Sequence, residues 1–426
     1  MSVAAAGDRP PRVLVLSRCT SEFGSSRGGV DVLSRRHAEL LARTGSEVTF
    51  VGTAELDTPG ITSVLVHTRD LFRRRPDGAV PPVHSVAYLV NEGLHVLHGT
   101  LMAARQQRRH ASDIVISNSS LSTVVLRMLS CPGGLVHYVH DGLAPEPSAS
   151  EGRLPFTRRL VNGFMEKLAL RSADRVICAS DGIATQAESV GVPRDRLSVM
   201  YPLLRRLGRR AAAGVPNAAH APELAGLRPF LLSVGQQTGR KRFDLLIDAL
   251  ASLPRPVRLV LVGNGPFHAT YRAQAERMGL ADRVVFMSDA SDVTLDLLYE
   301  ACSGFVLASE NEGFPITVAE ALSHGSPVVL ACPSTVALRR ILGSEHVVIL
   351  RDLSSRAVAV GIRTMLRHSG GDRELVRSEI RRWAVDNLPS DEDIRREYDG
   401  IFGSLLGPSP PSRGGEEPLS VLQSNG

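Results

Sequence analysis

Residues 309–331 constrain the fold most strongly, because they contain a helix signal and a strand signal and directly follow another strand signal. The apolar run 304–308 predicts a short strand, and a polar turn follows it. Pro315 suits the first position of a helix, where its missing N–H costs no hydrogen bond. Gly325 suits the left-handed residue that ends a helix, and Pro327 prevents the helix from resuming. The stretch therefore predicts a strand–loop–helix–strand unit, which is the repeating element of parallel α/β sheets.

The loop and first turn of this unit carry two carboxylates, Glu312 and Glu320, with seven residues between them. We expect the backbone amides of Ile316 and Thr317 to be free at the helix start, where such groups bind anions. Ionised carboxylates only accept hydrogen bonds, so they suit the hydroxyls of a polyol. Together these groups predict a ligand that has both hydroxyls and phosphates, such as a nucleotide sugar.

Size and composition are those of an ordinary soluble protein. The 426 residues are enough for two domains, and 43% of them are apolar and 22% charged. The 49 basic and 44 acidic residues give a net charge of +5, which fits an anionic substrate or an anionic membrane surface. No basic helix interleaved with aromatics is present, so we expect no nucleic-acid partner.

The five cysteines are an odd number, are far apart and form no CxxC motif. We therefore expect free thiols rather than a disulfide framework or a zinc site. Residues 1–11 lack the apolar core of a signal peptide, and no run of about 18 apolar residues occurs. We expect a cytoplasmic protein, with peripheral attachment to a membrane as an alternative.

The first half opens with the apolar strand 12–17, a polar loop that contains Gly28 and Gly29, and the amphipathic helix 31–44. This order is typical of nucleotide-binding α/β domains. The loop does not read GxGxxG, so a dinucleotide is not indicated. Two interpretations stay open: a plain turn, or glycines that let backbone amides approach a phosphate or sugar.

Strands and helices alternate along the rest of the chain, so the fold class is α/β with two Rossmann-like, doubly wound domains that face a cleft. His140 directly follows the strand 135–139, and ligands of parallel sheets bind at the carboxyl ends of strands. The other predicted strands are 48–51, 113–117, 173–179, 197–201, 230–234, 257–262, 283–287, 327–331 and 347–350. The other predicted helices with assigned bounds are 86–107, 155–171, 243–253, 295–301, 354–367, 372–387 and 391–405.

Arginines cluster in two places in the first half. Residues 69–82 combine four arginines with prolines and predict an exposed basic loop, and the helix 86–107 ends among Arg105, Arg108 and Arg109. Such clusters are usually solvated surfaces. The alternative is contact with an acidic acceptor or an anionic lipid surface.

The residues around Glu312 carry the most specific resemblance. Glu312, Gly313, Phe314 and Pro315, followed by Glu320, are similar to the E-x7-E motif of the GT-B nucleotide-sugar glycosyltransferases, in particular the large retaining family 4. Other elements resemble those of this family in the same order over residues 11–405. They are the first-domain glycine loop with Gly28 and Gly29, the active-site histidine at His140, the phosphate-binding strand–loop from Gly235 to Lys241, and the G-x-G-P turn of Gly263 to Pro266.

The resemblance implies the GT-B fold and a division of labour between its domains. Residues 11–203 would form the acceptor-side domain and residues 229–390 the nucleotide-sugar-binding domain, with an interdomain linker at 204–228. The helix 391–406 would pack back towards the first domain, and residues 407–426, rich in Pro, Ser and Gly, would form a disordered tail.

The resemblance also implies catalytic roles for Lys241, Glu312 and His140. Lys241 would neutralise the donor diphosphate, Glu312 would hold the transferred hexose, and His140 would contact the sugar. Glu320 would bind the ribose. The other residues implied around the donor are Gly28, Gly29, Gly235, Arg240, Gly263, Gly265, Gly313, Phe314, Pro315, Ile316 and Thr317. No cofactor and no metal ion is implied; the partners are a nucleotide-sugar donor and an acceptor of unknown type.

Three positions depart from the family pattern. Gln236 replaces the usual Arg beside the diphosphate, with Arg240 or Arg242 as possible replacements. Arg242 itself replaces a usual Gly, and residues 201–203 replace a common Asn-Gly-Val. A retaining hexosyltransferase is the expected function. The alternatives are a nucleotide-sugar epimerase or phosphorylase of the same fold, or an inactive nucleotide-sugar-binding partner, which Gln236 would favour.

Overall fold

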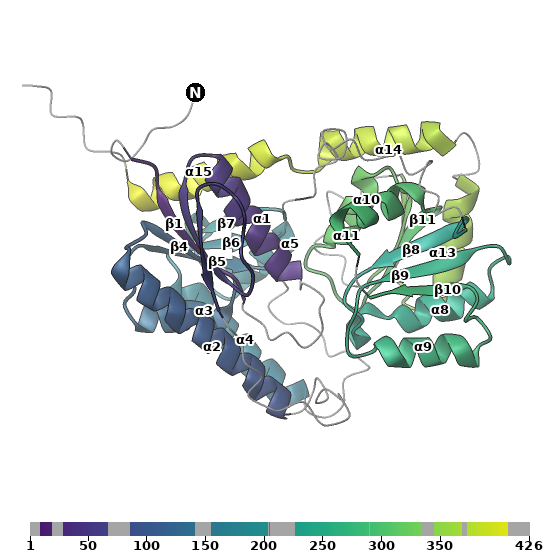
Figure 1. Ribbon diagram of the computed structural model, residues 1–426, viewed down its shortest axis with the longest axis horizontal. Coiled ribbons are helices and arrows are strands. Elements are labelled where there is room, and N and C mark those ends of the chain that lie inside the picture. Colours follow the sequence, from purple (N-terminus) through teal and green to yellow (C-terminus); the bar gives the residue numbers. More distant parts are fainter. Residues whose placement is uncertain are drawn as a thin grey trace, which may run out of the picture.

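Two parallel β-sheets, each flanked by helices, form the two halves of the protein (Figure 1). The computed structural model describes residues 9–18, 29–66, 86–140, 155–202, 204, 226–288, 290–333, 345–368 and 373–407. Of the expected linker, only 204 and 226–228 belong to these residues, and of the expected tail only 407. The basic loop 69–82 lies outside them.

The first sheet has seven strands in the order β3-β2-β1-β4-β5-β6-β7, and every neighbouring pair is parallel. The strand order reverses between β1 and β4, which is where such sheets bind ligands. The strands are β1 Arg12–Leu16, β2 Glu47–Gly52, β3 Ile61–Leu65, β4 Ile114–Ser117, β5 Gly134–Val139, β6 Arg175–Cys178 and β7 Leu197–Val199. The α-helices of this half are α1 Gly29–Arg43, α2 Val86–Arg109, α3 Ser120–Met128, α4 Pro155–Ser172 and α5 Asp181–Ser189.

The second sheet has six parallel strands in the order β10-β9-β8-β11-β12-β13, with its switch point between β8 and β11. The strands are β8 Phe230–Val234, β9 Arg258–Val262, β10 Val284–Met287, β11 Gly304–Ala308, β12 Val328–Ala331 and β13 Val347–Leu350. The helices are the 3₁₀ turn η3 Gly239–Lys241, α8 Phe243–Ala251, α9 His268–Arg277, α10 Asp292–Ala301, α11 Ile316–Ser323, α13 Ser355–His368, α14 Arg373–Asn387 and α15 Asp391–Leu406.

Apolar layers cover both faces of the second sheet. Alternate residues of β11 enter different cores: Phe305 packs with the cluster under α11, and Val306 packs with the cluster under α8. A strand that is buried on both faces must be apolar at every position, which is why continuous apolar runs predict these strands. No helix among the described residues has the length and apolar character needed to cross a bilayer.

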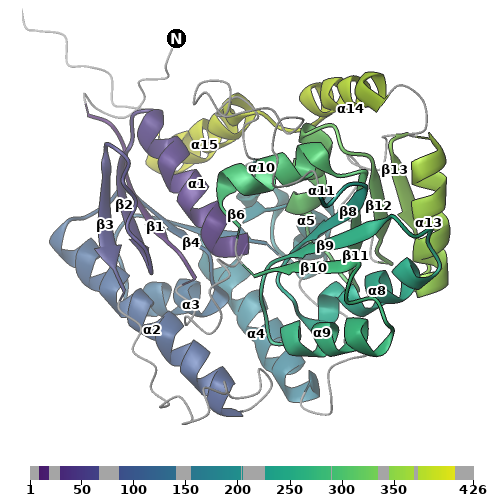
Figure 2. The same ribbon diagram turned by 45° about the vertical axis from the view of Figure 1, so that its right-hand side comes forward.

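The last two helices connect the halves of the molecule. Figures 1 and 2 show α14 beside the second sheet and α15 beside the first. A capping box between Ser390 and Asp393 starts α15. Its apolar face, with Tyr398 and Phe402, then packs into the core of the first sheet.

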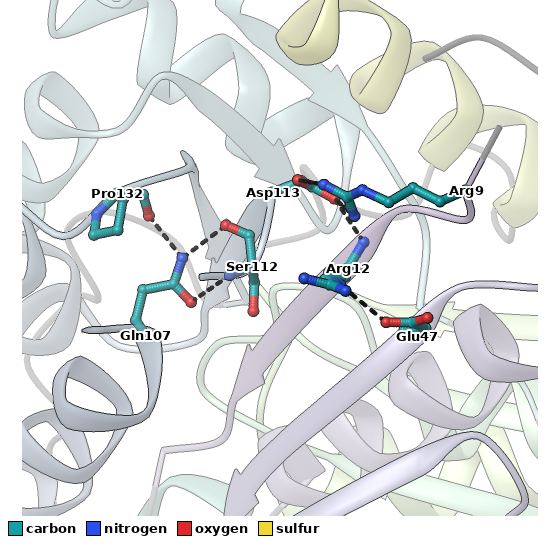
Figure 3. A network of polar contacts seen from close by, with 7 residues as sticks. All are labelled: Arg9, Arg12, Glu47, Gln107, Ser112, Asp113 and Pro132. Atoms are coloured by element: carbon teal, nitrogen blue, oxygen red, sulfur yellow. Dashed lines mark hydrogen bonds and ion pairs between the residues drawn. The ribbon is translucent and has the colours of Figure 1, made fainter. Parts of the chain in front are cut away.

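A polar network closes the amino-terminal edge of the first sheet (Figure 3). The guanidinium of Arg9 binds both carboxylate oxygens of Asp113, at 3.0 and 2.8 Å, and Asp113 also accepts from the backbone N–H of Arg12 at 2.8 Å. Gln107 bonds the backbone of Ser112 through both ends of its amide, at 2.7 and 3.1 Å. These bonds hold the starts of β1 and β4 in register, at the edge opposite the one where parallel sheets bind ligands.

The sequence predicts β8, β11 and β13 with the bounds that the structure has, but it misses β3 and α3. The edge strand β3 has no buried residue and therefore lacks a strong apolar pattern. Helix α3 is rich in Ser, Thr and Val, which are poor helix formers. It forms because tertiary contacts outweigh propensity: Ser122, for example, accepts a hydrogen bond from Thr100 of α2 at 2.9 Å.

Candidate active site

The expected carboxylate Glu312 forms a buried ion pair with the expected lysine. Lys241, the last residue of η3, donates from Nζ to Oε1 of Glu312 at 2.6 Å, and Nη1 of Arg240 lies 3.7 Å from the same oxygen. Burial alone would raise the pKa of Glu312. The charges of Lys241 and Arg240 outweigh burial and hold this pKa below its ordinary value. Glu312 is therefore ionised at neutral pH and acts only as a hydrogen-bond acceptor.

The second carboxylate, Glu320, is held from the other half of the molecule. Nη2 of Arg36, on α1, lies 3.0 Å from Oε1 of Glu320, and Tyr299 donates its hydroxyl to Oε2 at 3.2 Å. The side chain of Glu320 is 7% exposed and that of Arg36 17%. Neither Arg36 nor Tyr299 is among the site residues expected from the sequence. Arg36 belongs to the polar face of α1, and no motif marks it. It contacts Glu320 because α1 packs close to α11.

Glycines in the loops after β8 and β9 let these neighbouring strand ends approach closely. Gly263 has φ +122°, and a Cβ on it would lie 2.2 Å from the carbonyl oxygen of Gly235. A Cβ on Gly265 would lie 2.5 Å from the carbonyl oxygen of Gln237. The side-chain amide of Gln237 also donates to the Gly263 carbonyl at 2.6 Å. Packing alone therefore requires Gly263 and Gly265, whether or not a phosphate binds beside them.

The start of α11 differs in detail from the prediction. The helix begins at Ile316, with Pro315 as the residue before it, and Gly325 takes the expected left-handed conformation with φ +76°. The prediction of a free Ile316 amide was wrong, because this N–H donates to the carbonyl of Phe314 at 2.9 Å in a tight turn. Among the described residues the Thr317 amide has no acceptor.

Buried residues before this helix join the two halves. Gly313, Phe314 and Pro315 are buried, and the Phe314 ring packs edge to face on Tyr201, with ring centroids 5.4 Å apart. Tyr201 follows β7, the last strand of the first sheet. The departure from the family pattern at residues 201–203 thus supplies an aromatic contact between the domains.

His140 lies where the sequence predicts, at the carboxyl end of β5. Its Nε2 is 2.8 Å from Oδ1 of Asn118, and its ring stacks on Tyr138 with centroids 4.2 Å apart. Burial, with the nearby charges of His137 and Arg18, lowers the pKa of His140 to about 3. Gly29 is the first residue of α1, and Gly28 lies outside the described residues. Within the described part of the chain, neither His140 nor Gly29 makes a polar contact with Lys241, Glu312 or Glu320.

The unusual Arg242 has a local explanation. Its backbone is left-handed, with φ 41° and ψ 42°, a conformation that favours glycine. Its guanidinium binds Asp244 at 2.9 Å and lies 3.6 Å from Glu310. Arg240 contacts both Glu312 and the backbone of Asn311, whereas Arg242 is bound to Asp244. Of the two, Arg240 is therefore the better candidate for the cation that the family has at the position of the exposed Gln236.

The described residues show free thiols and no metal-binding cluster. Cys178, Cys302 and Cys332 are buried, Cys131 is half-buried, and all four are free. Cys19 lies outside the described residues. No group of three or more His, Cys, Asp or Glu side chains suited to a metal ion occurs in this part of the chain.

Comparison with known families matches both halves of the chain. Residues 27–204 match the family described as Glycosyltransferase Family 4, and residues 218–368 match the family described as Glycosyl transferases group 1. The chain belongs to the GT-B glycosyltransferases. The expected family, fold and enzyme class are thereby confirmed.

Relatives with known names are glycosyltransferases too. The D-inositol 3-phosphate glycosyltransferase of Nocardia farcinica is 29% identical over 364 residues, which cover 76% of this chain and 74% of that protein. The α-monoglucosyldiacylglycerol synthase of Streptococcus pneumoniae is 25% identical over 200 residues, covering 46% of this chain and 43% of that protein.

Solved structures share the fold of this glycosyltransferase. Sucrose-phosphate synthase from Thermosynechococcus elongatus superposes with a TM-score of 0.71 at 19% identity, over 93% of this chain and 100% of that one. Anabaena HepE in complex with UDP and glucose superposes with a TM-score of 0.63 at 20% identity, again over 93% and 100%.

Proposed function

We propose that this glycosyltransferase moves a hexosyl unit from a nucleoside diphosphate sugar to an acceptor hydroxyl, with retention of anomeric configuration. The observation that carries the proposal is the pair of buried carboxylates Glu312, in the loop before α11, and Glu320, within α11, each held by a cation. Cations and acceptor-only carboxylates together match a ligand that has both phosphates and hydroxyls.

In this mechanism negative charge grows on the leaving diphosphate as the glycosidic bond breaks. Lys241 and Arg240 neutralise that charge, and the Thr317 amide donates to a phosphate oxygen. Glu312 accepts from hydroxyls of the hexose and Glu320 from those of the ribose. A preorganised donor of this kind contributes roughly 3 kcal/mol to transition-state stabilisation.

Retention requires the acceptor to attack from the side that the diphosphate leaves. The proposal assigns the acceptor proton to the leaving phosphate and charge neutralisation to Lys241 and Arg240 rather than to a metal ion. Unchanged turnover after treatment with a chelator is the expected result. Analysis of the anomeric configuration of the product tests retention directly.

The proposed acceptor is lipid-linked, and the enzyme binds it at an anionic membrane surface. On α4 the side chains of Val161, Phe164 and Leu168 are 60%, 66% and 37% exposed and share one helix face. The exposed Lys167 and Arg171 lie on the same helix. An exposed apolar row with basic neighbours is typical of helices that lie in a membrane interface. The lipid product named in the synthase from Streptococcus pneumoniae agrees with this acceptor class.

Two experiments test the proposal. A thermal-shift screen of UDP-, GDP-, dTDP- and ADP-sugars identifies the donor, because a ligand stabilises the folded state by mass action. Product that forms only when an acceptor is present excludes an epimerase. Sedimentation with phosphatidylglycerol vesicles tests the membrane surface: Phe164→Glu should abolish binding, whereas the control Val385→Glu, at a position 75% exposed on α14, should retain it.

A further inference from the structure

The carboxylate of Glu320 is held by one donor from each half of the protein. Arg36, on α1, binds Oε1 at 3.0 Å, and Tyr299, on α10, donates its hydroxyl to Oε2 at 3.2 Å. A phenol hydroxyl has one hydrogen to donate, and an ionised carboxylate only accepts. The contact with Arg36 depends on how the two halves are placed, whereas the contact with Tyr299 lies entirely within the second half.

The ring of Tyr299 is fixed in position by its packing. It is completely buried, it stacks on His324 with centroids 5.2 Å apart, and it packs on Phe305 of β11 with centroids 5.8 Å apart. The backbone carbonyl of Tyr299 also accepts a hydrogen bond from the hydroxyl of Ser326. A ring that is packed in this way cannot turn its hydroxyl away from Glu320, so Oε2 has a donor at a fixed place.

The residue His324, directly after α11, holds the backbone of Glu320 to the same helix. A carbonyl oxygen only accepts, so Nδ1 of His324 donates to the backbone carbonyl of Glu320, at 2.8 Å. Nε2 of the same ring lies 3.3 Å from Oδ1 of Asp296, which precedes Tyr299 by about one turn on α10. Through these contacts α10 supports both the backbone and the carboxylate of Glu320.

We propose that Tyr299 is the positioning residue that presents Glu320 to the donor ribose. By binding Oε2, it directs Oε1 towards the first half of the molecule, where Arg36 lies. Oε1 is then the acceptor that the guanidinium yields to the ribose hydroxyls. A carboxylate that is ordered before the ligand arrives binds it without the entropic cost of ordering at that moment. This inference rests on the proposed ribose-binding role of Glu320 and adds the residue that supports it.

The test is calorimetric titration of the full-length protein with UDP, GDP and ADP, each compared with its 2′,3′-dideoxy analogue. The variants are compared with the nucleotide that binds most tightly. The wild-type protein should prefer the ribonucleotide by about tenfold or more, because the analogue has no hydroxyls to donate to Glu320. Tyr299→Phe keeps the ring and loses the hydroxyl. It should lose most of this preference and bind the dideoxy analogue as the wild type does, and an unchanged preference would overturn the inference.

A merely structural role for Tyr299 is excluded by combining the variants. Glu320→Gln should already have lost most of the preference. Adding Tyr299→Phe to it should therefore weaken ribonucleotide binding by less than about twofold more, since two residues that act through one contact are not additive. A further loss as large as the one that Tyr299→Phe causes in the wild-type background would show that Tyr299 acts independently of Glu320, which would also overturn the inference.

The matched control is Tyr398→Phe. It also removes a buried phenol hydroxyl, which lies 3.0 Å from Nδ1 of His37 in the core of the first sheet. Thermal unfolding should show a similar loss of stability in the two Tyr→Phe variants, but Tyr398→Phe should keep the preference for the ribonucleotide. Loss of the preference in both variants would mean that it only follows stability, and the inference would be wrong.

Failure of the inference can be told from failure of the proposed function. If the wild type showed no preference, or if Glu320→Gln kept it, Glu320 would not bind the ribose, and the proposed donor site would be wrong together with the inference. If Glu320→Gln lost the preference and Tyr299→Phe kept it, only the role of Tyr299 would be wrong.

Discussion

Arg36 of α1 and Glu320 of α11 form an ion pair, with Nη2 and Oε1 3.0 Å apart, that joins the two halves of the protein. The pair occupies one oxygen of the carboxylate that we propose binds the ribose. A nucleotide must therefore either displace the guanidinium of Arg36 from Glu320 or share the carboxylate with it. If Glu320 binds the ribose as proposed, Arg36 would link occupancy of the donor site to the contact between the domains.

Arg36→Ala should destabilise the protein by roughly 3 kcal/mol, because removing one partner of a buried pair leaves the other charge without compensation. Chemical unfolding measures this loss. Arg43→Ala is the matched control on the same helix. Arg43 is 41% exposed and lies 3.7 Å from Asp391, so its loss should cost less than about 1 kcal/mol. Equal losses in the two variants would show that the contact with Glu320 is not special.

Lys241→Met should lower kcat by roughly 100-fold or more, because the variant keeps the apolar stem but loses the cation that meets the developing phosphate charge. Steady-state kinetics with the donor found by the thermal-shift screen measures the loss. The substitution also removes the main charge that holds the pKa of Glu312 down. Wild-type turnover in Lys241→Met would remove Lys241 from the mechanism.

Arg242→Gly provides the neighbouring control. Glycine adopts the left-handed conformation at φ 41° without strain, which should gain about 1 kcal/mol. Loss of the part-exposed pairs with Asp244 and Glu310 should cost a similar amount or less. We expect stability within about 1 kcal/mol of the wild type and unchanged kcat. A loss of kcat as large as that of Lys241→Met would mean that Arg242 binds the diphosphate.

The pH dependence of stability should include a contribution from Glu166 on α4. Burial would raise its pKa, but the bonds and charge of His137 and the bond from Ser120 hold the pKa below the ordinary 4.5. A carboxyl with a depressed folded pKa stabilises the protein above its unfolded pKa and loses that contribution as the pH falls through the folded value.

Thermal unfolding measured from neutral pH down through pH 4.5 tests this contribution. Glu166→Gln should be less stable than the wild type at neutral pH and should lose less stability on acidification. Glu345→Gln, at a side chain 89% exposed, is the control and should follow the wild type. Parallel curves for Glu166→Gln and the wild type would contradict the assignment.

The sequence predicted the fold well because the four central strands of the second sheet, β8, β9, β11 and β12, are buried, and each reads as an apolar run. It singled out Glu312 and Glu320 by the E-x7-E spacing and Lys241 by its spacing from Gly235, both of which resemble family motifs, and their roles stay predictions. It could not predict Arg36, since the register of α1 against α11 depends on how the two sheets pack. Asn118 was missed for a similar reason: its contacts with Leu16 and His140 depend on the pairing of β4 with β1 and β5, which joins residues far apart in the chain.

Gly263→Ala tests the close approach of the loops after β8 and β9. The new Cβ would lie 2.2 Å from the carbonyl oxygen of Gly235, and φ is +122°. We expect a loss of at least about 2 kcal/mol from strain and displaced backbone. Gly163→Ala, in α4 with no heavy atom within 4 Å of the new Cβ, should instead stabilise by about 0.5–1 kcal/mol. Thermal unfolding distinguishes the two, and similar effects would refute the packing argument.

Calorimetric titration of the donor-site variants with a nucleoside diphosphate and with pyrophosphate tests the central claim most directly. The nucleotide to use is the one identified by the thermal-shift screen. Glu320→Gln should weaken nucleotide binding by about tenfold or more, since it loses a charged acceptor for the ribose hydroxyls, and should leave pyrophosphate binding unchanged. Lys241→Met should weaken both. Wild-type affinity for the nucleotide in both variants would contradict a donor site built on Glu320 and Lys241.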